Sequence, residues 1–292
     1  MATFLGKYGA TVFIGTPFLM GVFAGFFYCR GADRSIRGAV IVGAMSQGVG
    51  ALLLMLFAVE GGICLTMAVP ITIPAGALGS LIGRALAGIK PNQMATSLSV
   101  PLMMLPLMTI VDEPQPTLRQ VETRVVVEAP PERVWDVVVA FPEIPEDFER
   151  SWLFQAGVAA PLRARIEGQG VGAVRHCEFT TGAFVEPITV WQPPRHLAFD
   201  VTSQPEPMTE MSFWRHVHAP HLVNGTLRSE RGEFRLNPLP GGKTELIGRT
   251  WYRVRMEPEP YWSTWVDVIV HQVHRRVLKH IAHVSAAKAA GH

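Results

Sequence analysis

The sequence predicts an all-α transmembrane bundle followed by a soluble α+β domain in which an antiparallel sheet wraps around a long C-terminal helix. Three observations support this prediction. The first 111 residues carry only six basic and two acidic residues, and they contain long uncharged apolar stretches. The remainder carries 20 basic and 22 acidic residues, alternates between apolar and polar positions, and ends in one amphipathic helical pattern.

The transmembrane region is predicted over residues 1–111, with about four helices. A spanning helix needs about 20 apolar residues, because each residue advances the helix by about 1.5 Å. The four uncharged stretches of that length are residues 8–29, 38–59, 61–83 and 91–111. The last two contain prolines, which bundled helices tolerate but which also permit a re-entrant segment, so three spans is the alternative.

The charged loops predict the orientation. Three arginines lie between the first and second spans, Arg84 and Lys90 lie between the third and fourth, and Glu60 lies between the second and third. Basic loops face the cytoplasm. With four spans the C-terminal domain lies on the opposite side, which for the inner membrane of a bacterium is the periplasm, whereas three spans would reverse this placement.

Composition excludes several functional classes. The net charge of +2 comes from the short loops of the membrane region, so nothing indicates nucleic-acid binding. No ionisable residue lies in the middle of a predicted span, which argues against an ion-coupled carrier. Membrane lipids are therefore the expected partners of the first region. Gly21 and Gly25 have the spacing of closely packed helices, within the bundle or, as the alternative, in a homo-oligomer.

The soluble domain is predicted over residues 120–288, after an acidic, proline-containing linker at residues 112–119. Residues 121–127 alternate as a half-buried strand does, and Pro130-Pro131 then opens a helix. A second short helix is predicted at residues 146–154. Further strands, separated by glycine and proline turns, are predicted at residues 162–167, 173–180, 185–191, 196–203, 225–236 and 244–255.

The last predicted element is a long helix over residues 259–288. Its apolar positions repeat at spacings of three and four and therefore lie on one face. This stripe consists of Trp262, Val266, Ile269, Val273, Val277, His280 and Val284. The concave face of the sheet is the apolar surface available to cover it.

Three short motifs carry a resemblance to a known family. Residues 129–135 (APPERVW), 168–175 (GQGVGAVR) and 191–197 (WQPPRHL) resemble the helix entry, first hairpin and next turn of START-like domains. These form the SRPBCC superfamily of polyketide cyclases/dehydrases and lipid-transport proteins, and the resemblance covers residues 121–284. It implies a helix-grip fold with a cavity for hydrophobic molecules such as lipids, sterols or polyketides, and in some members cyclisation or dehydration.

Candidate ligand-binding residues follow from the strand and helix patterns. Arg228 and Glu230, with Tyr252, are expected to orient the polar end of a ligand. The other candidates are Trp262, on the aromatic end of the last helix, and His176 and His280, each a candidate acid or base. The alternative is a self-neutralising Arg–Glu pair and a core histidine. No nucleophile–base spacing is visible, so the catalytic residues stay unassigned.

A metal site has one weak candidate. Asp267, His271 and His274 follow each other at helical spacings and project from one side of the last helix. A solvated helix flank explains the same pattern, and no remote ligand is recognisable. The three cysteines lie too far apart in the sequence for a metal motif. We therefore predict neither a metal nor another cofactor.

Taken with the resemblance, the sequence favours a membrane-anchored protein that binds a hydrophobic or lipid-like small molecule. Such binding would serve transport or sensing. Binding is favoured over catalysis. The alternatives are a cyclase- or dehydratase-type enzyme acting on a polyketide-like or aromatic substrate, and a regulatory membrane protein whose soluble domain binds another protein.

Overall fold

The computed structural model describes residues 8–32, 34–89, 103, 115–214, 217, 219 and 225–290. The predicted fourth span, residues 91–111, lies outside the described residues except for Met103. The chain forms two compact units, each treated by itself below. The first contains the N-terminal helices together with residues 210–224 and Arg255–Trp262, and the second contains the sheet and most of the last helix.

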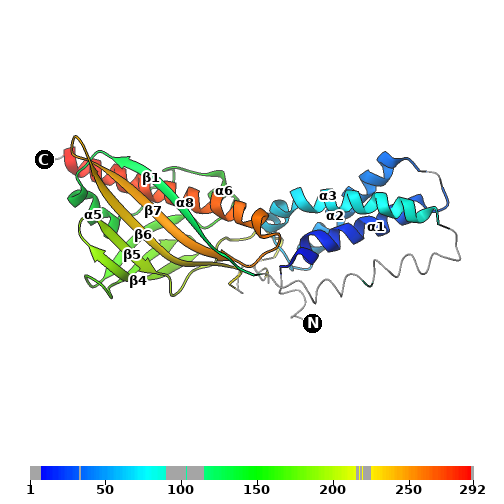
Figure 1. Cartoon of the computed structure of the whole chain (residues 1–292), viewed down its shortest axis with the longest axis horizontal. Coiled ribbons are helices and arrows are strands. Elements are labelled where there is room, and N and C mark those ends of the chain that lie inside the picture. Colours follow the sequence, from blue (N-terminus) through cyan, green and yellow to red (C-terminus); the bar gives the residue numbers. More distant parts are fainter. Residues whose placement is uncertain are drawn as a thin grey trace. The chain divides into compact units, whose positions relative to one another are not determined.

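The first unit is helical (Figure 1). A π-helical turn, η1 (Thr11–Gly15), leads into α1 (Thr16–Cys29), which is followed by α2 (Ile36–Leu56) and α3 (Gly62–Ala87). Within the described residues, three helices are long and apolar enough to cross a membrane, and they coincide with the first three predicted spans. Helix α3 runs without interruption through Pro70 and Pro74.

Glycines allow the helices of this unit to approach closely. A Cβ atom at Gly21 would lie 2.0 Å from the carbonyl oxygen of Gly76, and one at Gly25 would lie 2.2 Å from that of Ser80. Such separations are far below van der Waals contact, so only glycine fits at either position. The predicted small-residue spacing therefore packs α1 against α3 within one chain.

Two later segments complete the first unit. The carboxylate of Glu210 accepts hydrogen bonds from the backbone N–H groups of Ile63, at 2.9 Å, and Cys64, at 3.2 Å. It thereby satisfies two of the unpaired donors at the start of α3 and complements the positive end of the helix dipole. Trp262 is buried in the same unit, with its ring 4.6 Å from that of Phe13.

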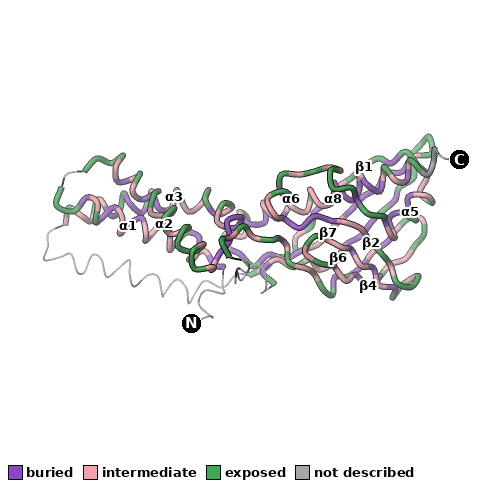
Figure 2. Tube along the Cα trace, turned by 180° about the vertical axis from the view of Figure 1, so that it is seen from behind, coloured by how far each residue is buried: buried purple, intermediate pink, exposed green. Residues whose placement is uncertain are grey.

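The second unit is built on a seven-stranded antiparallel sheet. Its strands are β1 (Leu118–Val127), β2 (Pro161–Glu167), β3 (Val174–Phe179), β4 (Gly182–Gln192), β5 (His196–Asp200), β6 (Leu227–Leu239) and β7 (Lys243–Val254). Their order is β1-β7-β6-β5-β4-β3-β2. From β2 to β7 each strand lies beside the next one in the sequence, and β1 pairs with β7 at the edge of the sheet. Buried and exposed positions alternate along much of the sheet (Figure 2). Every predicted strand is present.

The curled sheet holds the last helix, α8 (Glu259–Ala290), which together with the sheet confirms the predicted helix-grip fold (Figure 1). The core lies where α5 (Pro131–Val139) and the C-terminal half of α8 meet the sheet, and it includes Val277, Leu278 and Ile281. The predicted helix at residues 146–154 is wrong in extent. Glu149 has a φ of +46°, which ends the turn before it, so a short α6 (Trp152–Ala156) forms only after that residue.

A β-bulge interrupts the pairing of β6 with β7. Ser229 pairs with Tyr252 and Arg231 pairs with Trp251, so Glu230 is an extra residue. Because side chains alternate with a period of two, one extra residue reverses the faces of all residues before it. Phe234 and Leu236 face the core as the alternation predicts, but Ser229 faces inward and Arg228 is exposed.

Candidate functional site

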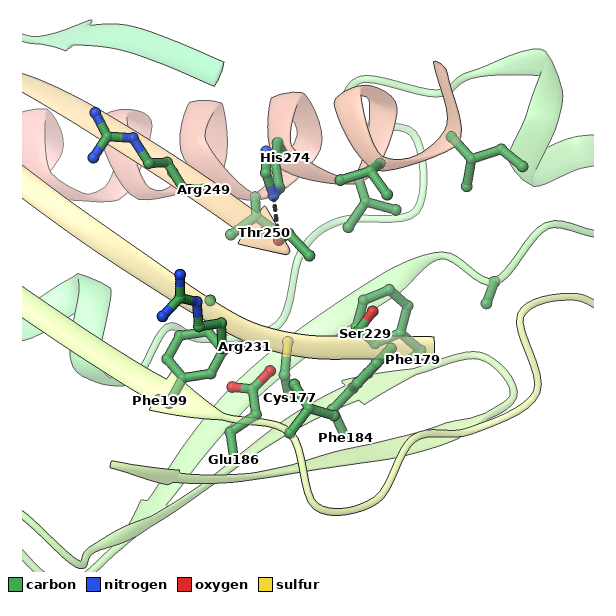
Figure 3. Close-up of a pocket in the computed structure, with 18 of the residues that line it drawn as sticks. Cys177, Phe179, Phe184, Glu186, Phe199, Ser229, Arg231, Arg249, Thr250 and His274 are labelled. Carbon is green, nitrogen blue, oxygen red and sulfur yellow. Dashed lines mark hydrogen bonds between the residues drawn. The ribbon is translucent and has the colours of Figure 1, made fainter. Parts of the chain in front are cut away.

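A cavity of about 150 Å³ lies between the sheet and the middle of helix α8. Ile269, Val273 and Val277 form its helical wall, so the middle of the predicted apolar stripe faces the cavity. Aromatic side chains from the sheet form the opposite wall: Phe179, Phe184, Phe199 and Phe234. Figure 3 shows the sheet side, with Cys177, Phe184 and Glu186, opposite His274 of the helix.

Small residues on two neighbouring strands leave this space open. Ser229 and Gly232 of β6 and Gly248 and Thr250 of β7 all line the cavity. A Cβ atom at Gly232 would lie 2.6 Å from Cζ of Phe199, so a side chain is excluded there as long as that ring keeps its position. The two strands therefore present few atoms to the middle of α8. The helix cannot move closer to the sheet there, because its C-terminal half packs against larger core residues.

An ion pair is buried in the cavity wall. Arg175 of β3 is 1% exposed and Glu186 of β4 is 5% exposed. Arg175 Nη1 donates a hydrogen bond to Glu186 Oε2, and its Nε donates to the carbonyl oxygen of Val139 at 3.2 Å. Arg175 Nη2 is buried and has no hydrogen-bond partner among the described residues. A bound molecule with an acceptor oxygen would satisfy that donor.

Three aromatic rings surround the guanidinium group of Arg175. Its central carbon lies 5.4 to 5.6 Å from the ring centres of Phe141, Phe199 and Phe234. Each ring attracts the cation through its negative face, and the packing limits the rotation of the side chain. The cavity therefore has a mainly apolar lining in which Arg175 is held beside its counter-ion, and Arg231, Arg249 and Glu206 are further charged residues of the lining.

Burial controls the protonation of the cavity side chains. Burial raises the pKa of the Glu186 carboxyl, and the neighbouring Arg175 only partly offsets this effect. Burial opposes the charge of Arg175 itself, but Glu186 and Cys177 together outweigh burial, and the pKa of the guanidinium is raised. Burial raises the pKa of the Cys177 thiol to about 12. Cys177 is thus an uncharged, weakly nucleophilic group.

His274 is the histidine that lines the cavity. Burial, together with a smaller contribution from nearby His271, lowers its pKa to about 3, so the ring is neutral at physiological pH. Its Nε2 is hydrogen-bonded to the Thr250 hydroxyl at 2.8 Å, the bond drawn in Figure 3, and its Nδ1 to Thr123 at 3.2 Å. Both ring nitrogens are occupied, so His274 is held by two strands rather than directed at a ligand.

The predicted ligand-binding residues of β6 lie outside the main cavity. Arg228 is exposed, and the carboxylate of Glu230 pairs with Arg253 at 3.4 Å. The bulge at Glu230 explains their orientation, because it reverses the expected alternation at the start of the strand. Their contribution to ligand binding stays a prediction, and Arg228 is considered again below.

The other predicted ligand-binding residues are also absent from the cavity lining. Tyr252 is buried against α8, and its hydroxyl donates to Asp267 Oδ1 at 2.5 Å. His280 Nε2 donates to the carbonyl oxygen of Pro142 at 3.1 Å. His176 lies on the outer face of β3, 3.7 Å from Glu167, and Trp262 packs in the first unit. These contacts are structural, and nothing in them tests a role in binding.

The weak metal-site candidate is engaged in other contacts. Asp267 lies 3.6 Å from the Arg119 guanidinium, and His271 Nδ1 is hydrogen-bonded to Thr123 at 2.8 Å. Among the residues that the structure describes, no three histidine, cysteine, aspartate or glutamate side chains come together as metal ligands would. Thr123 instead connects His271 and His274 to β1.

Sequence reasoning missed Arg175 and Glu186, although one signal was present. Strand β3 contains Arg175, Cys177 and Phe179 in alternation with His176 and Glu178. Of the residues that share a face with Arg175, both Cys177 and Phe179 are apolar, so this face was the better candidate for the interior. A charged residue on an otherwise apolar strand face indicates a buried charge. Such a charge needs an opposite charge close by, and the neighbouring strand is where that partner is expected.

Comparison with known proteins agrees with this fold. Residues 119–258 match the family model described as "Polyketide cyclase / dehydrase and lipid transport". The match covers the sheet and ends at the start of the last helix, and the N-terminal region lies outside it. No curated protein sequence matches the chain.

Similar solved structures come from several organisms. The Zhui aromatase/cyclase from Streptomyces sp. R1128 is 15% identical, covering 59% of this chain and 96% of that protein, with a TM-score of 0.38. A norcoclaurine synthase point mutant from Thalictrum flavum, in complex with a transition-state analogue, is 10% identical, covering 60% and 98%, with a TM-score of 0.38. A protein from Nitrosospira multiformis is 18% identical, covering 59% and 99%, with a TM-score of 0.36.

Proposed function

We propose that this chain is a membrane-anchored protein whose START-like domain binds a compact hydrophobic small molecule in the cavity beneath α8. One observation carries the proposal: an apolar cavity is bordered by the buried ion pair of Arg175 and Glu186, and Arg175 has an unsatisfied donor. Apolar walls with few, well-placed polar groups are typical of small-molecule sites. The family match over residues 119–258 supports the same function.

The size of the cavity limits the ligand. Its volume is about 150 Å³, whereas pockets for drug-sized ligands span roughly 300 to 1,000 Å³. An engineered apolar cavity of about 150 Å³ stays dry and binds benzene. The expected ligand is therefore a single ring system or a short chain, with an oxygen that accepts a hydrogen bond from Arg175.

Membrane anchoring suits such a ligand. Three helices of the described chain have the length and apolar character of membrane spans. A hydrophobic ligand partitions into the bilayer, so a tethered domain meets it at a higher local concentration than a free one. The lipid surroundings are then both the anchor and the source of the ligand.

The test compares two valine substitutions on the same helix. Val273→Phe places a ring in the cavity, whereas Val268→Phe places one at a position that is 41% exposed and outside the cavity lining. Native mass spectrometry of the full-length protein should detect a bound small molecule in the parent and in Val268→Phe but not in Val273→Phe. Retention of the molecule by Val273→Phe, or its absence from the parent, would contradict the proposal.

A second candidate function is catalysis of the cyclase or dehydratase type, favoured by Glu186. A carboxyl group whose pKa is raised by burial, in the wall of a mainly apolar cavity, is suited to proton transfer. Such transfer at a carbon atom exchanges hydrogen with solvent. The molecule released from the parent after incubation in D₂O should then carry carbon-bound deuterium. Exchange no faster than with heat-denatured protein would leave binding as the function.

A further inference from the structure

A second hollow adjoins the main cavity at the start of β6. It has a volume of about 150 Å³ and is lined by Val201, Thr202, Ser203, Gln204, Gly225, Arg228 and Ser229. Val201 and Ser229 also line the main cavity. The two hollows are therefore neighbours that share two lining side chains, one of which is small.

The Gln204 side chain and the β6 bulge form this second hollow. Gln204 Nε2 donates to the carbonyl oxygen of Leu227 at 2.7 Å, and its Oε1 accepts from the N–H of Ser229 at 2.8 Å. A side-chain amide thus replaces a strand partner where β5 has already ended. The backbone stays satisfied without a neighbouring strand, and the gap beside it stays open.

The second hollow is electropositive. Among the described residues that line it, Arg228 is the one charged side chain. Among the described residues, Arg228 has no hydrogen-bond or ion-pair partner. The nearest carboxylate along the strand, that of Glu230, is paired with Arg253. An arginine that faces a hollow without a counter-ion is suited to bind an anionic oxygen in a two-pronged contact.

We propose that the ligand is a single-chain or single-ring amphiphile with an anionic head, whose apolar part occupies the main cavity and whose head binds Arg228 in the second hollow. This inference rests on the proposed function and assigns the chemistry of its ligand. Val201 and Ser229 line both the mainly apolar main cavity and the second hollow, where Arg228 lies. The volume of the main cavity, about 150 Å³, suits one chain or ring better than the two chains of a membrane lipid.

The experiment uses two probes that differ only in their head group. Octanoate carries a carboxylate and 1-octanol carries an uncharged hydroxyl on the same chain. Their affinities are measured by calorimetry on the full-length protein in lipid nanodiscs, with empty nanodiscs as the blank. The variants are Arg228→Gln, Arg228→Lys and the control Arg235→Gln. Arg235 is an exposed arginine of the same strand that lines neither hollow.

Arg228→Gln should weaken octanoate binding at least about fivefold, because a charge-assisted contact is lost, and should change octanol binding less than about twofold. Arg228→Lys should restore part of the octanoate affinity, and Arg235→Gln should change neither. Equal effects of Arg228→Gln on both probes, or no effect on either, would overturn the inference while leaving the proposed function intact. The proposed function itself fails if the parent binds neither probe or if Val273→Phe leaves both affinities unchanged.

Discussion

Replacing Glu186 with glutamine removes the negative half of the buried ion pair while keeping the shape of the side chain. Arg175 then remains as an uncompensated cation, 1% exposed, with a hydrogen bond to Val139 as its remaining polar contact. Removing one partner of a buried ion pair typically costs about 3 to 5 kcal/mol. Arginine cannot relieve this cost by losing its proton, because its pKa is too high.

The reciprocal change, Arg175→Met, should behave differently because Glu186 can take up a proton. Without the guanidinium, burial holds the folded-state pKa of Glu186 further above the unfolded value of roughly 4.3. A group whose folded-state pKa is raised contributes stability below the unfolded pKa and loses it as the pH rises through the folded-state pKa. The deficit of Arg175→Met should therefore be small near pH 4 and grow towards pH 7.

Native-state hydrogen exchange of the full-length protein measures these changes at the strands concerned. For Glu186→Gln, protection of the slowest amides of β3 and β4 should fall by a factor on the order of 10² to 10⁴, which corresponds to the cost above. The double variant Arg175→Met/Glu186→Leu should recover most of the parental protection, because apolar residues of similar volume often replace a buried pair at no cost.

Glu178→Gln is the matched control. Glu178 lies on the outer face of β3, where it pairs with Arg163 at 2.6 Å, and solvent can replace the lost contact. The reasoning is refuted if Glu186→Gln changes protection no more than Glu178→Gln does. It is also refuted if the double variant is as unstable as either single variant, because the cost would then come from packing rather than from an unpaired charge.

Three further predictions concern the first unit. Gly21→Leu should lower the thermal stability of the helical unit in detergent, because no side chain fits there. Gly48→Leu should not lower it, since a Cβ atom at Gly48 meets nothing within 4 Å. Equal effects of the two substitutions would contradict the packing of α1 against α3. A reporter that fluoresces only in the cytoplasm, fused after His292, should stay dark if there are four spans, and a bright signal would show an odd number. Trp262→Ala should lower the free energy of unfolding of the first unit by about 3 to 5 kcal/mol, measured by hydrogen exchange around Phe13, and should leave the affinity for octanoate unchanged. Weaker octanoate binding would instead show that Trp262 belongs to the ligand site.

Much of the fold was predictable because it depends on repeating patterns. Alternation identified β1, turn residues delimited the later strands, and spacings of three and four identified α8 with its apolar stripe. Such signals are summed over many residues, so single exceptions do not change them. The helix at residues 146–154 was misplaced because one backbone angle, at Glu149, ended the preceding turn, and no pattern announces such an angle in advance.

The candidate site was less predictable because it depends on single residues. One extra residue, Glu230, reversed the orientation of Arg228, and nothing in the alternation of charged and polar residues between 228 and 231 reveals where a bulge falls. The Arg175–Glu186 pair depends on the register between β3 and β4, which brings residues 175 and 186 opposite each other. Register follows from hairpin geometry and from the core, so the partner of a buried charge is found only once the strands are paired.

Three features that each reduce stability coincide at the main cavity. The small residues of β6 and β7 leave a void, and a void in a core costs stability in proportion to its volume. A buried ion pair is seldom more stable than apolar residues of the same size, and a buried donor without a partner, Arg175 Nη2, adds its own penalty. A sequence selected for stability alone would remove any of the three by simple substitution. Local departures from good packing and satisfied polarity are expected where a protein has a function to serve. A ligand that fills the void and accepts a hydrogen bond from Arg175 would relieve two of the three costs at once, which is why the cavity, rather than the better-packed histidines of α8, is the site to test.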